Sequence, residues 1–206
     1  MNVRVLKRFV IYMAILTFVM FTVWALVRSF MNRPPGDYET EVCDMRLKDG
    51  LYDQAIQAAN TALEKTPNHR GAIMCKALVF ISQKMYLEAN EELNYLINFL
   101  EKNIEDDDKT GKGTLAAAYA TRGIIKDRLE NYEGALEDYI KAIKIDEEAV
   151  GGPGFGTVIL NYKFKSSSVK ERAIYIYEQF QLPEDERVLK LKELDEGQVM
   201  HKPGKL

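Results

Sequence analysis

Two histidines are the first residues of this chain to consider for catalysis. The chain has 206 residues, and neither His69 nor His201 has an evident partner or accompanies a nucleophile motif. General acid–base and nucleophilic catalysis need several activated groups brought together. We therefore expect no catalytic residues, no enzyme activity, and histidines that lie on the surface without a role.

An acidic segment at residues 105–108 is the candidate for a metal site. Asp106, Asp108 and Gly111 match the first, third and sixth positions of an EF-hand calcium loop. The twelfth position must supply a bidentate carboxylate, but Ala117 stands there. The pattern favours a solvated loop, and we expect no metal.

Two glycine-containing segments are similar only in part to phosphate-binding loops. Residues 111–114 lack the upstream glycine and the preceding strand that aim backbone amides at a phosphate. Residues 151–156 have the wrong spacing for a dinucleotide fingerprint. We expect a hinge or a long loop at residues 151–156, no cofactor, and no small-molecule substrate.

The strongest pattern in the chain is a repeated set of small and aromatic residues. Tyr52 and Ala55 recur about 34 residues apart as Tyr86 and Ala89, and a third set follows after a delay that the polar segment 102–113 explains. Spacings of i, i+4, i+7 and i+8 predict amphipathic helices. The residues that carry the three sets are Ala55, Ala59, Ala62, Leu63 and Pro67; Ala77, Phe80, Ala89 and Leu93; Tyr119, Gly123, Tyr132, Ala135, Tyr139, Ala142 and Ile143.

This pattern resembles the tetratricopeptide repeat (TPR) family, whose units are antiparallel helix pairs. Lys84 departs from the family by standing where a turn glycine is usual. The resemblance implies an all-α, TPR-type α-solenoid of helix-turn-helix repeats, and the apolar segment described below adds one transmembrane helix before it. Together they divide the chain into 1–30 (cytoplasmic N-terminus and transmembrane helix), 31–37 (linker), 38–149 (repeats 36–69, 70–103 and 116–149), 150–196 (degenerate fourth repeat and capping helix) and 197–206 (flexible tail).

The fourth repeat depends on weaker signals. Counting part of residues 151–156 as an insertion brings Asn161, Phe164, Ala173, Ile174 and Tyr177 into register. Ser168 and Glu171 form a capping-box pattern before a helix over residues 169–181. Pro183 and the acids after it suit the first turn of a last helix, which would cap the stack.

A long apolar segment precedes the repeats. Residues 9–27 carry no charge and would span about 28 Å as a helix. A cleaved signal peptide is the alternative, but its apolar core is usually shorter and ends in small residues. We expect an uncleaved anchor. A buried core helix is the other alternative, and the absence of a polar face argues against it.

Charges around this segment predict its orientation. Arg4, Lys7 and Arg8 precede it, whereas Arg28 and Arg33 follow it and are soon joined by acids. The positive-inside rule then places the N-terminus in the cytoplasm. We expect a single-pass protein of a bacterial inner membrane with its repeats in the periplasm, or in an equivalent compartment.

The charge of the remaining chain limits its partners. Five of the 28 basic residues and none of the 31 acidic ones lie in the first 33 positions, which leaves 23 basic against 31 acidic residues and a net charge of −8. Such a surface repels phosphate backbones. We expect no nucleic-acid partner.

The two cysteines have two interpretations. Cys43 and Cys75 fall on the first helices of successive repeats. Such thiols usually act as small apolar core residues, and spacing alone cannot establish the geometry of a disulfide. We expect two apolar core residues, and a disulfide remains open.

The resemblance implies a partner-binding groove along the first helix of each repeat. The side chains mapped to it are apolar with an acidic end, and burial of four aliphatic or thioether groups would outweigh rim charges. Alternatively, the chain itself fills this face, through residues 158–160 or the C-terminal helix. The expected groove residues are Glu41, Asp44, Met74, Cys75, Leu78, Ile81, Ala120, Thr121 and Ile124.

These features together predict a membrane-anchored adaptor or chaperone-like protein. It would bind membrane-proximal protein partners through the groove and recruit or assemble them. The alternative is a permanent structural or assembly subunit of a membrane protein complex.

Overall fold

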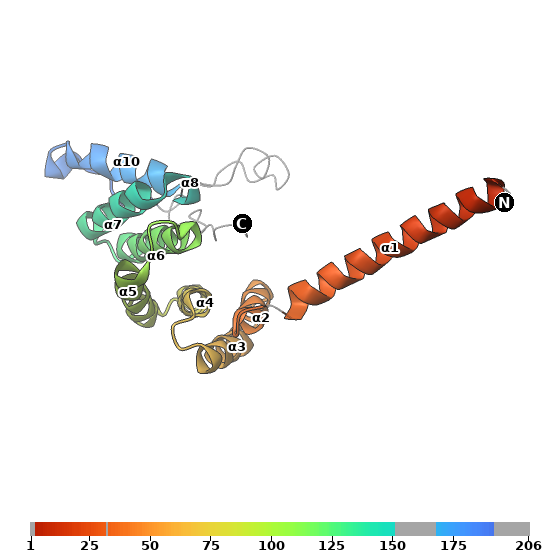
Figure 1. Cartoon of the computed structure of the whole chain (residues 1–206). Coiled ribbons are helices and arrows are strands. Elements are labelled where there is room, and N and C mark those ends of the chain that lie inside the picture. The colour runs from red at the N-terminus through yellow and green to blue at the C-terminus, as the bar shows by residue number, and fades with distance from the viewer. Residues whose placement is uncertain (1–2, 32, 151–167, 192–206) are drawn as a thin grey trace.

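The computed structural model describes residues 3–31, 33–150 and 168–191, and every regular element in these ranges is helical (Figure 1). Helix α1 extends away from the other helices, which stack against one another along a curved path. The elements are α1 (Val3–Met31), α2 (Asp37–Lys48), α3 (Tyr52–Lys65), α4 (Arg70–Ser82), α5 (Tyr86–Asn103), α6 (Lys109–Arg128), α7 (Tyr132–Ile145), α8 (Glu147–Val150), α10 (Val169–Phe180) and the 3₁₀ turn η1 (Glu184–Glu186).

Six of these helices form three consecutive pairs, α2 with α3, α4 with α5, and α6 with α7. Each pair closes through the same turn, with a left-handed residue at Gly50 (φ 73°), Lys84 (φ 61°) and Glu130 (φ 62°). In each turn the next residue donates its N–H to the carbonyl five positions back, as Leu51 does to Arg46 at 2.9 Å. This bond caps the end of the first helix. The turn glycine expected by the resemblance is thus replaced by lysine and glutamate in the same backbone conformation.

The paired helices approach each other at small residues. Ala55, Ala89 and Ala135, one in each second helix, are fully buried. Across from Ala135, a Cβ atom on Gly123 would lie 2.6 Å from the ring of Tyr139. The sequence pattern therefore marks the contacts between helices correctly.

The extra residues between the second and third repeats of the sequence pattern lie mainly in longer helices. Helix α5 has 18 residues where α3 has 14, and α6 has 20 where α4 has 13. Helix α6 begins at Lys109, seven residues before the expected start of the third repeat at Ala116. Only residues 104–108 form a loop, because Asp108 caps α6 by accepting a hydrogen bond from the Gly111 N–H at 2.7 Å.

A disulfide joins the first two pairs. Cys43 of α2 and Cys75 of α4 are bonded, with their Cα atoms 6.4 Å apart. Both are fully buried, in a cluster with Ala55, Ala59 and Val79. The expectation of two separate apolar thiols was wrong, because the packing of α4 on α2 brings the two sulfur atoms together.

Helix α10 packs on the third pair around a buried ion pair. The Arg172 guanidinium donates two hydrogen bonds of 2.8 Å to the Asp127 carboxylate. The Tyr139 hydroxyl donates a third, at 3.1 Å. The predicted capping box is confirmed, since the Ser168 hydroxyl accepts from the Glu171 N–H and the Glu171 carboxylate accepts from the Ser168 N–H.

The expected last helix after Pro183 does not form over residues 183–191. A single 3₁₀ turn is followed by non-helical backbone. Side chains of α10 bind this backbone instead, because Gln179 Oε1 accepts from the Val188 N–H at 2.7 Å and Tyr175 donates to the Val188 carbonyl at 2.7 Å. The expectations for residues 151–167, for the part of the capping helix at residues 192–196 and for the tail that includes His201 lie outside the described residues.

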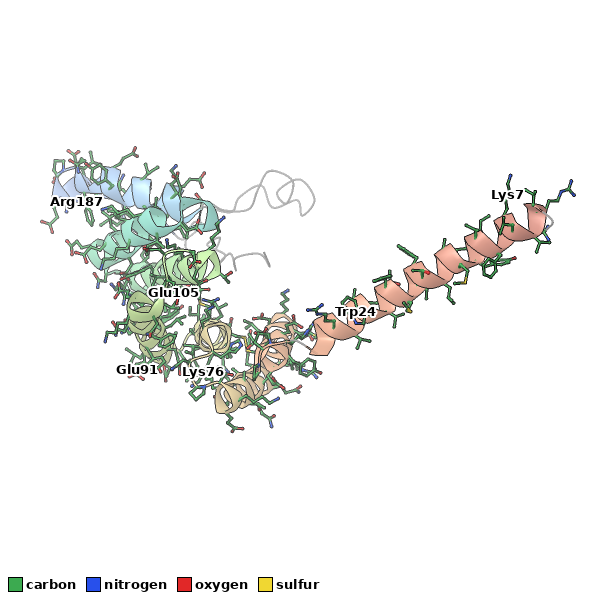
Figure 2. The ribbon with its side chains drawn as sticks, in the orientation of Figure 1. Lys7, Trp24, Lys76, Glu91, Glu105 and Arg187 are labelled. Atoms are coloured by element: carbon green, nitrogen blue, oxygen red, sulfur yellow. A yellow bond between two sulfur atoms is a disulfide. The ribbon has the colours of Figure 1, made fainter. Side chains whose placement is uncertain are left out.

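Helix α1 is long and apolar enough to cross a membrane. An 18-residue window within its segment Val3–Arg28 has a mean hydropathy of 2.4, and none of that window is buried. The hydroxyl groups of its two threonines are satisfied within the helix, since Thr17 donates to the Met13 carbonyl and Thr22 to the Val19 carbonyl, both at 2.8 Å. Figure 2 shows the side chains of α1 projecting free of the other helices, with Lys7 near one end and Trp24 toward the other.

The lysine in the second turn gives a first prediction. Lys84→Gly should stabilise the protein by about 1 kcal/mol, because only glycine adopts positive φ without steric cost. Urea unfolding of both proteins measures the change. As a control, Gln83→Gly should destabilise, since φ there is −87°. A loss of stability in Lys84→Gly would contradict the assigned turn.

The disulfide gives a second prediction. Reduction of the bond between Cys43 and Cys75, which lie 32 positions apart in the chain, should lower the free energy of unfolding by about 3 to 4 kcal/mol. Thermal melts with and without a reducing agent measure this. The Cys43→Ala, Cys75→Ala double variant should be insensitive to the reducing agent, and an equally insensitive native protein would show that the bond is absent.

Candidate partner-binding face

The nine residues expected to line a groove come from the first helices of the three pairs. Glu41 and Asp44 lie on α2, and Ala120, Thr121 and Ile124 lie on α6. The remaining four, Met74, Cys75, Leu78 and Ile81, lie on α4. We call the side of α2, α4 and α6 that carries these nine residues the first-helix face.

Most of the apolar residues on this face are interior. Met74 is 4% exposed and Ala120 is 3% exposed, and both belong with Ile81 to the central core cluster. That cluster also contains Ala89 and Leu93 of α5. These side chains hold the stack together and do not form an open surface.

Three further expected residues are buried for different reasons. The sulfur atom of Cys75 is bonded to Cys43 in the disulfide. Thr121 is fully buried, and its hydroxyl donates to the Ala117 carbonyl at 2.6 Å. Ile124 is 2% exposed and packs with Ala173 of α10. A helical pattern identifies the face of each helix, but it does not show how far neighbouring helices cover that face.

Three of the nine residues remain at least partly accessible. Leu78 is half-buried and packs on the edge of the central cluster. Glu41 and Asp44 are also half-buried, and Glu41 accepts a hydrogen bond from Arg33 at 2.8 Å. The accessible part of the first-helix face is therefore smaller and more acidic than the sequence predicts.

A charged cluster that the sequence reading missed joins the second and third pairs. The Asp138 carboxylate is 2% exposed and accepts from Arg122 at 2.7 and 2.8 Å and from Lys126 at 2.9 Å. Arg122 also donates to Asn94 of α5 at 2.7 Å. The i, i+4 spacing of Arg122 and Lys126 is the only sequence signal for this cluster. It holds helices together, because every charge in it is paired.

A tyrosine beside this cluster has a perturbed ionisation. The Tyr119 hydroxyl donates to the Glu101 carboxylate, and the guanidinium of Arg122 lies 5.1 Å from its ring. Burial, followed by the bond to Glu101, raises the pKa of Tyr119 to about 12. The phenol therefore stays protonated near neutral pH and serves as a hydrogen-bond donor.

His69 is a structural residue, which corrects the expectation of a surface histidine without a role. Its side chain is 12% exposed, and its Nδ1 atom caps α4 by accepting from the Ala72 N–H at 3.2 Å. Its Nε2 atom lies 3.0 Å from the Asp37 carboxylate at the start of α2. Nearby, Thr66 donates to the Pro35 carbonyl at 2.8 Å. These contacts tie the linker after α1 to the loop before α4.

A pocket of about 400 Å³ opens beside the same linker. Its apolar lining includes Phe99 and Ile104, and its polar lining includes Arg70 and Asp108. Arg70 donates to Asp108 at 2.6 Å, and this bond, with the Gly111 N–H, holds the pKa of Asp108 below its ordinary value of 3.8. The ionised residues of the pocket are committed to each other, so the pocket shows no arrangement for catalysis.

Comparison with known proteins gives one partial similarity. A stretch of 108 residues, 52% of this chain, is 30% identical to RNA polymerase II-associated protein 3 of Xenopus tropicalis. The chain spans only 15% of the length of that relative. No protein-family model matches the chain. The similarity concerns a eukaryotic protein and adds nothing to the expectation of a bacterial membrane.

Among residues 3–31, 33–150 and 168–191, no group of three His, Cys, Asp or Glu side chains could hold a metal ion. The absence of enzyme activity remains a prediction.

The Arg70–Asp108 pair gives a third prediction. Asp108→Asn keeps a good helix cap but removes the charge, so it should cost about 0.5 kcal/mol at pH 7. Because the pKa of Asp108 is lower in the folded protein than its ordinary value of 3.8, the stabilisation by its charge is fully present above pH 3.8. It is lost as the pH falls through the pKa of Asp108 in the folded protein. Urea unfolding at pH 7 and at pH 2.5 should show the difference shrinking.

The neighbouring Asp107 supplies the matched control, because it is exposed. Asp107→Asn should leave stability unchanged at both pH values. A difference for Asp108→Asn that persists undiminished at the lower pH would rule out the charge as its cause.

Proposed function

We propose that this chain is a membrane-anchored, TPR-type adaptor that binds protein partners and holds them close to the bilayer. The observation that carries the proposal is the threefold recurrence of one helix pair. The left-handed turn residues lie 34 and 46 residues apart, and each is followed by a second helix that begins with tyrosine, at Tyr52, Tyr86 and Tyr132. Stacked helix pairs of this kind present extended surfaces suited to other proteins.

The partial relative is compatible with an interaction role. Its printed name describes a protein associated with RNA polymerase II. Association with other proteins is the property that we carry over to this chain, without the identity of the partner.

A membrane anchor is supported by the length, composition and exposure of α1. At 29 residues it is about 43 Å long, enough to cross the hydrocarbon core and the interfacial regions. Its apolar side chains have no covering element among the described helices. An exposed apolar helix of this kind is favourable in a bilayer and costly in water.

The disulfide supports placing the helical stack on the non-cytoplasmic side. Disulfides form and persist in oxidising compartments such as the periplasm or the lumen of the secretory pathway. The Cys43–Cys75 bond therefore agrees with the orientation that the positive residues before α1 favour. We propose a single-pass protein with a cytoplasmic N-terminus and its stack in a bacterial periplasm or an equivalent compartment.

The linker contacts support membrane-proximal partners. The linker between α1 and α2 is held by the contacts of Asp37 with His69 and of Pro35 with Thr66. Lys65 also donates to Glu39 at 2.6 Å. Because these contacts hold the segment after α1 against the helical stack, the stack stays near the bilayer. Its partners would then be membrane proteins or proteins delivered to the membrane.

The partner surface on this proposal is the accessible part of the first-helix face. Leu78 offers apolar area, while Glu41 and Asp44 favour a basic segment at one end. A permanent subunit of a membrane complex is the second candidate. It is favoured by the burial of most of the first-helix face, which leaves little surface for transient apolar binding.

Purification of the full chain from its native membrane after brief crosslinking tests the proposal. The variants are Leu78→Gln and a matched control, Leu87→Gln, whose side chain on α5 is 76% exposed. An adaptor should carry substoichiometric partners that are lost at least fivefold in Leu78→Gln and kept in Leu87→Gln. Thermal melts of both variants check that they fold.

Other outcomes decide between the alternatives. A stoichiometric complex retained by both variants would mean a permanent subunit, and no partner with either would reject both functions. In sealed inside-out vesicles from the same cells, protease should leave the stack intact. Digestion of the stack would place it in the cytoplasm.

A further inference from the structure

Helix α10 occupies the place of a first helix in a fourth pair. Its residues Ala173 and Ile176 pack with Ile124 of α6 and with Ala135 and Tyr139 of α7. Likewise Cys75 and Val79 of α4 pack with one residue of α2 and two of α3, which are Cys43, Ala55 and Ala59. Each of these helices thus lies across the pair that precedes it (Figure 1).

The two helices differ in what covers their other side. Helix α4 buries seven residues, because α5 covers its second face. Helix α10 buries only Arg172, Ala173 and Ile176. On its uncovered side Ile174 is 48% exposed and Tyr177 is 56% exposed, and Leu182 beyond its end is 38% exposed. We call these three residues the end face.

The chain after α10 cannot make the turn that starts a second helix. In the three complete pairs, the second residue after the helix cap donates its N–H to a carbonyl five positions back. After α10 the equivalent residue is Pro183, which has no N–H. The following segment instead runs back along another side of α10, where Leu189 joins the buried cluster and its carbonyl accepts from Arg172 at 2.9 Å.

We propose that the end face receives an amphipathic helix from a partner protein, which takes the place of a second helix beside α10, where the described residues 181–191 form no α-helix. A docked helix would cover the apolar groups of Ile174 and Tyr177 as α5 covers the second face of α4. Helices that dock in this way present an apolar stripe with spacings of three and four residues.

The charge around the end face specifies a basic partner helix. Glu178 of α10 and the three residues of η1, Glu184, Asp185 and Glu186, are all exposed. They outnumber the cation Arg187, whose Nε donates to the Leu182 carbonyl at 3.0 Å. An acidic rim attracts lysine and arginine at the edges of a docking helix. A second copy of this chain would bring an equally acidic rim, so like charges disfavour self-association through this face.

The end face is separate from the first-helix face of the proposed function. Figure 1 shows α5, α6 and α7 between α10 and the helices α2 and α4, which carry Glu41, Asp44 and Leu78. Helix docking here can therefore fail while partner binding through Leu78 holds, and the converse is also true.

Binding of designed peptides to the full chain in nanodiscs of zwitterionic lipid tests the proposal. Two 14-residue helical peptides share a stripe of alanine and leucine, and carry either lysine or glutamate elsewhere. Fluorescence anisotropy should show saturable binding of the lysine peptide and at least tenfold weaker binding of the glutamate peptide. The Ile174→Gln, Tyr177→Gln double variant should lose the lysine peptide at least tenfold, whereas Leu87→Gln should not.

Each other result would overturn the proposal. Equal binding of both peptides, unchanged binding to the double variant, or no binding of the lysine peptide at millimolar concentration would show that the end face does not select a basic helix. Dimers lost in the double variant, measured by sedimentation, would identify a second copy as the occupant. A melting temperature lowered by more than a few degrees in the double variant would mean that the chain itself covers this face.

Discussion

Close contact between two helices at an alanine is the constraint on which the rest of this structure depends. Ala55, Ala89 and Ala135 are fully buried where the helices of each pair meet. A larger side chain there would overpack the contact and push the helices apart, which typically costs about 1 to 3 kcal/mol. The left-handed turns follow from this contact, since two helices held so close must reverse direction within three residues.

Buried charge plays a different part at the end of the stack. The Arg172 and Asp127 side chains are 0% and 1% exposed, and removing one partner from such a pair typically costs about 3 to 5 kcal/mol. Apolar contacts between α10 and the third pair would tolerate a shift along the helix axis, but a bidentate ion pair would not. This pair therefore fixes which residues of α10 face inward, and leaves Ile174 and Tyr177 on the outside.

Sequence patterns predicted the positions and caps of the helices well. They predicted poorly which other helices cover each helix face. Amphipathic spacing located the six paired helices, and the Ser168–Glu171 capping box located the start of α10. These features depend on residues a few positions apart. The Cys43–Cys75 disulfide and the burial of Ile124 depend on contacts between separate helices, which spacing does not encode. Over residues 183–191 the expected helix does not form, and Pro183, which suits a helix start, has no N–H with which to complete the turn after α10.

The two ends of the stack are built for opposite purposes. At the end next to α1, a disulfide, a histidine cap and the bond from Thr66 to Pro35 restrict movement of the linker. At the other end, α10 is followed by a single 3₁₀ turn and non-helical backbone over residues 181–191. Rigidity at the base keeps the orientation of α10 constant relative to the linker, so a helix that docks there pays less ordering entropy on the side of this chain. On the proposal that the end face receives a helix, the constrained linker and the exposed side of α10 would act together in binding.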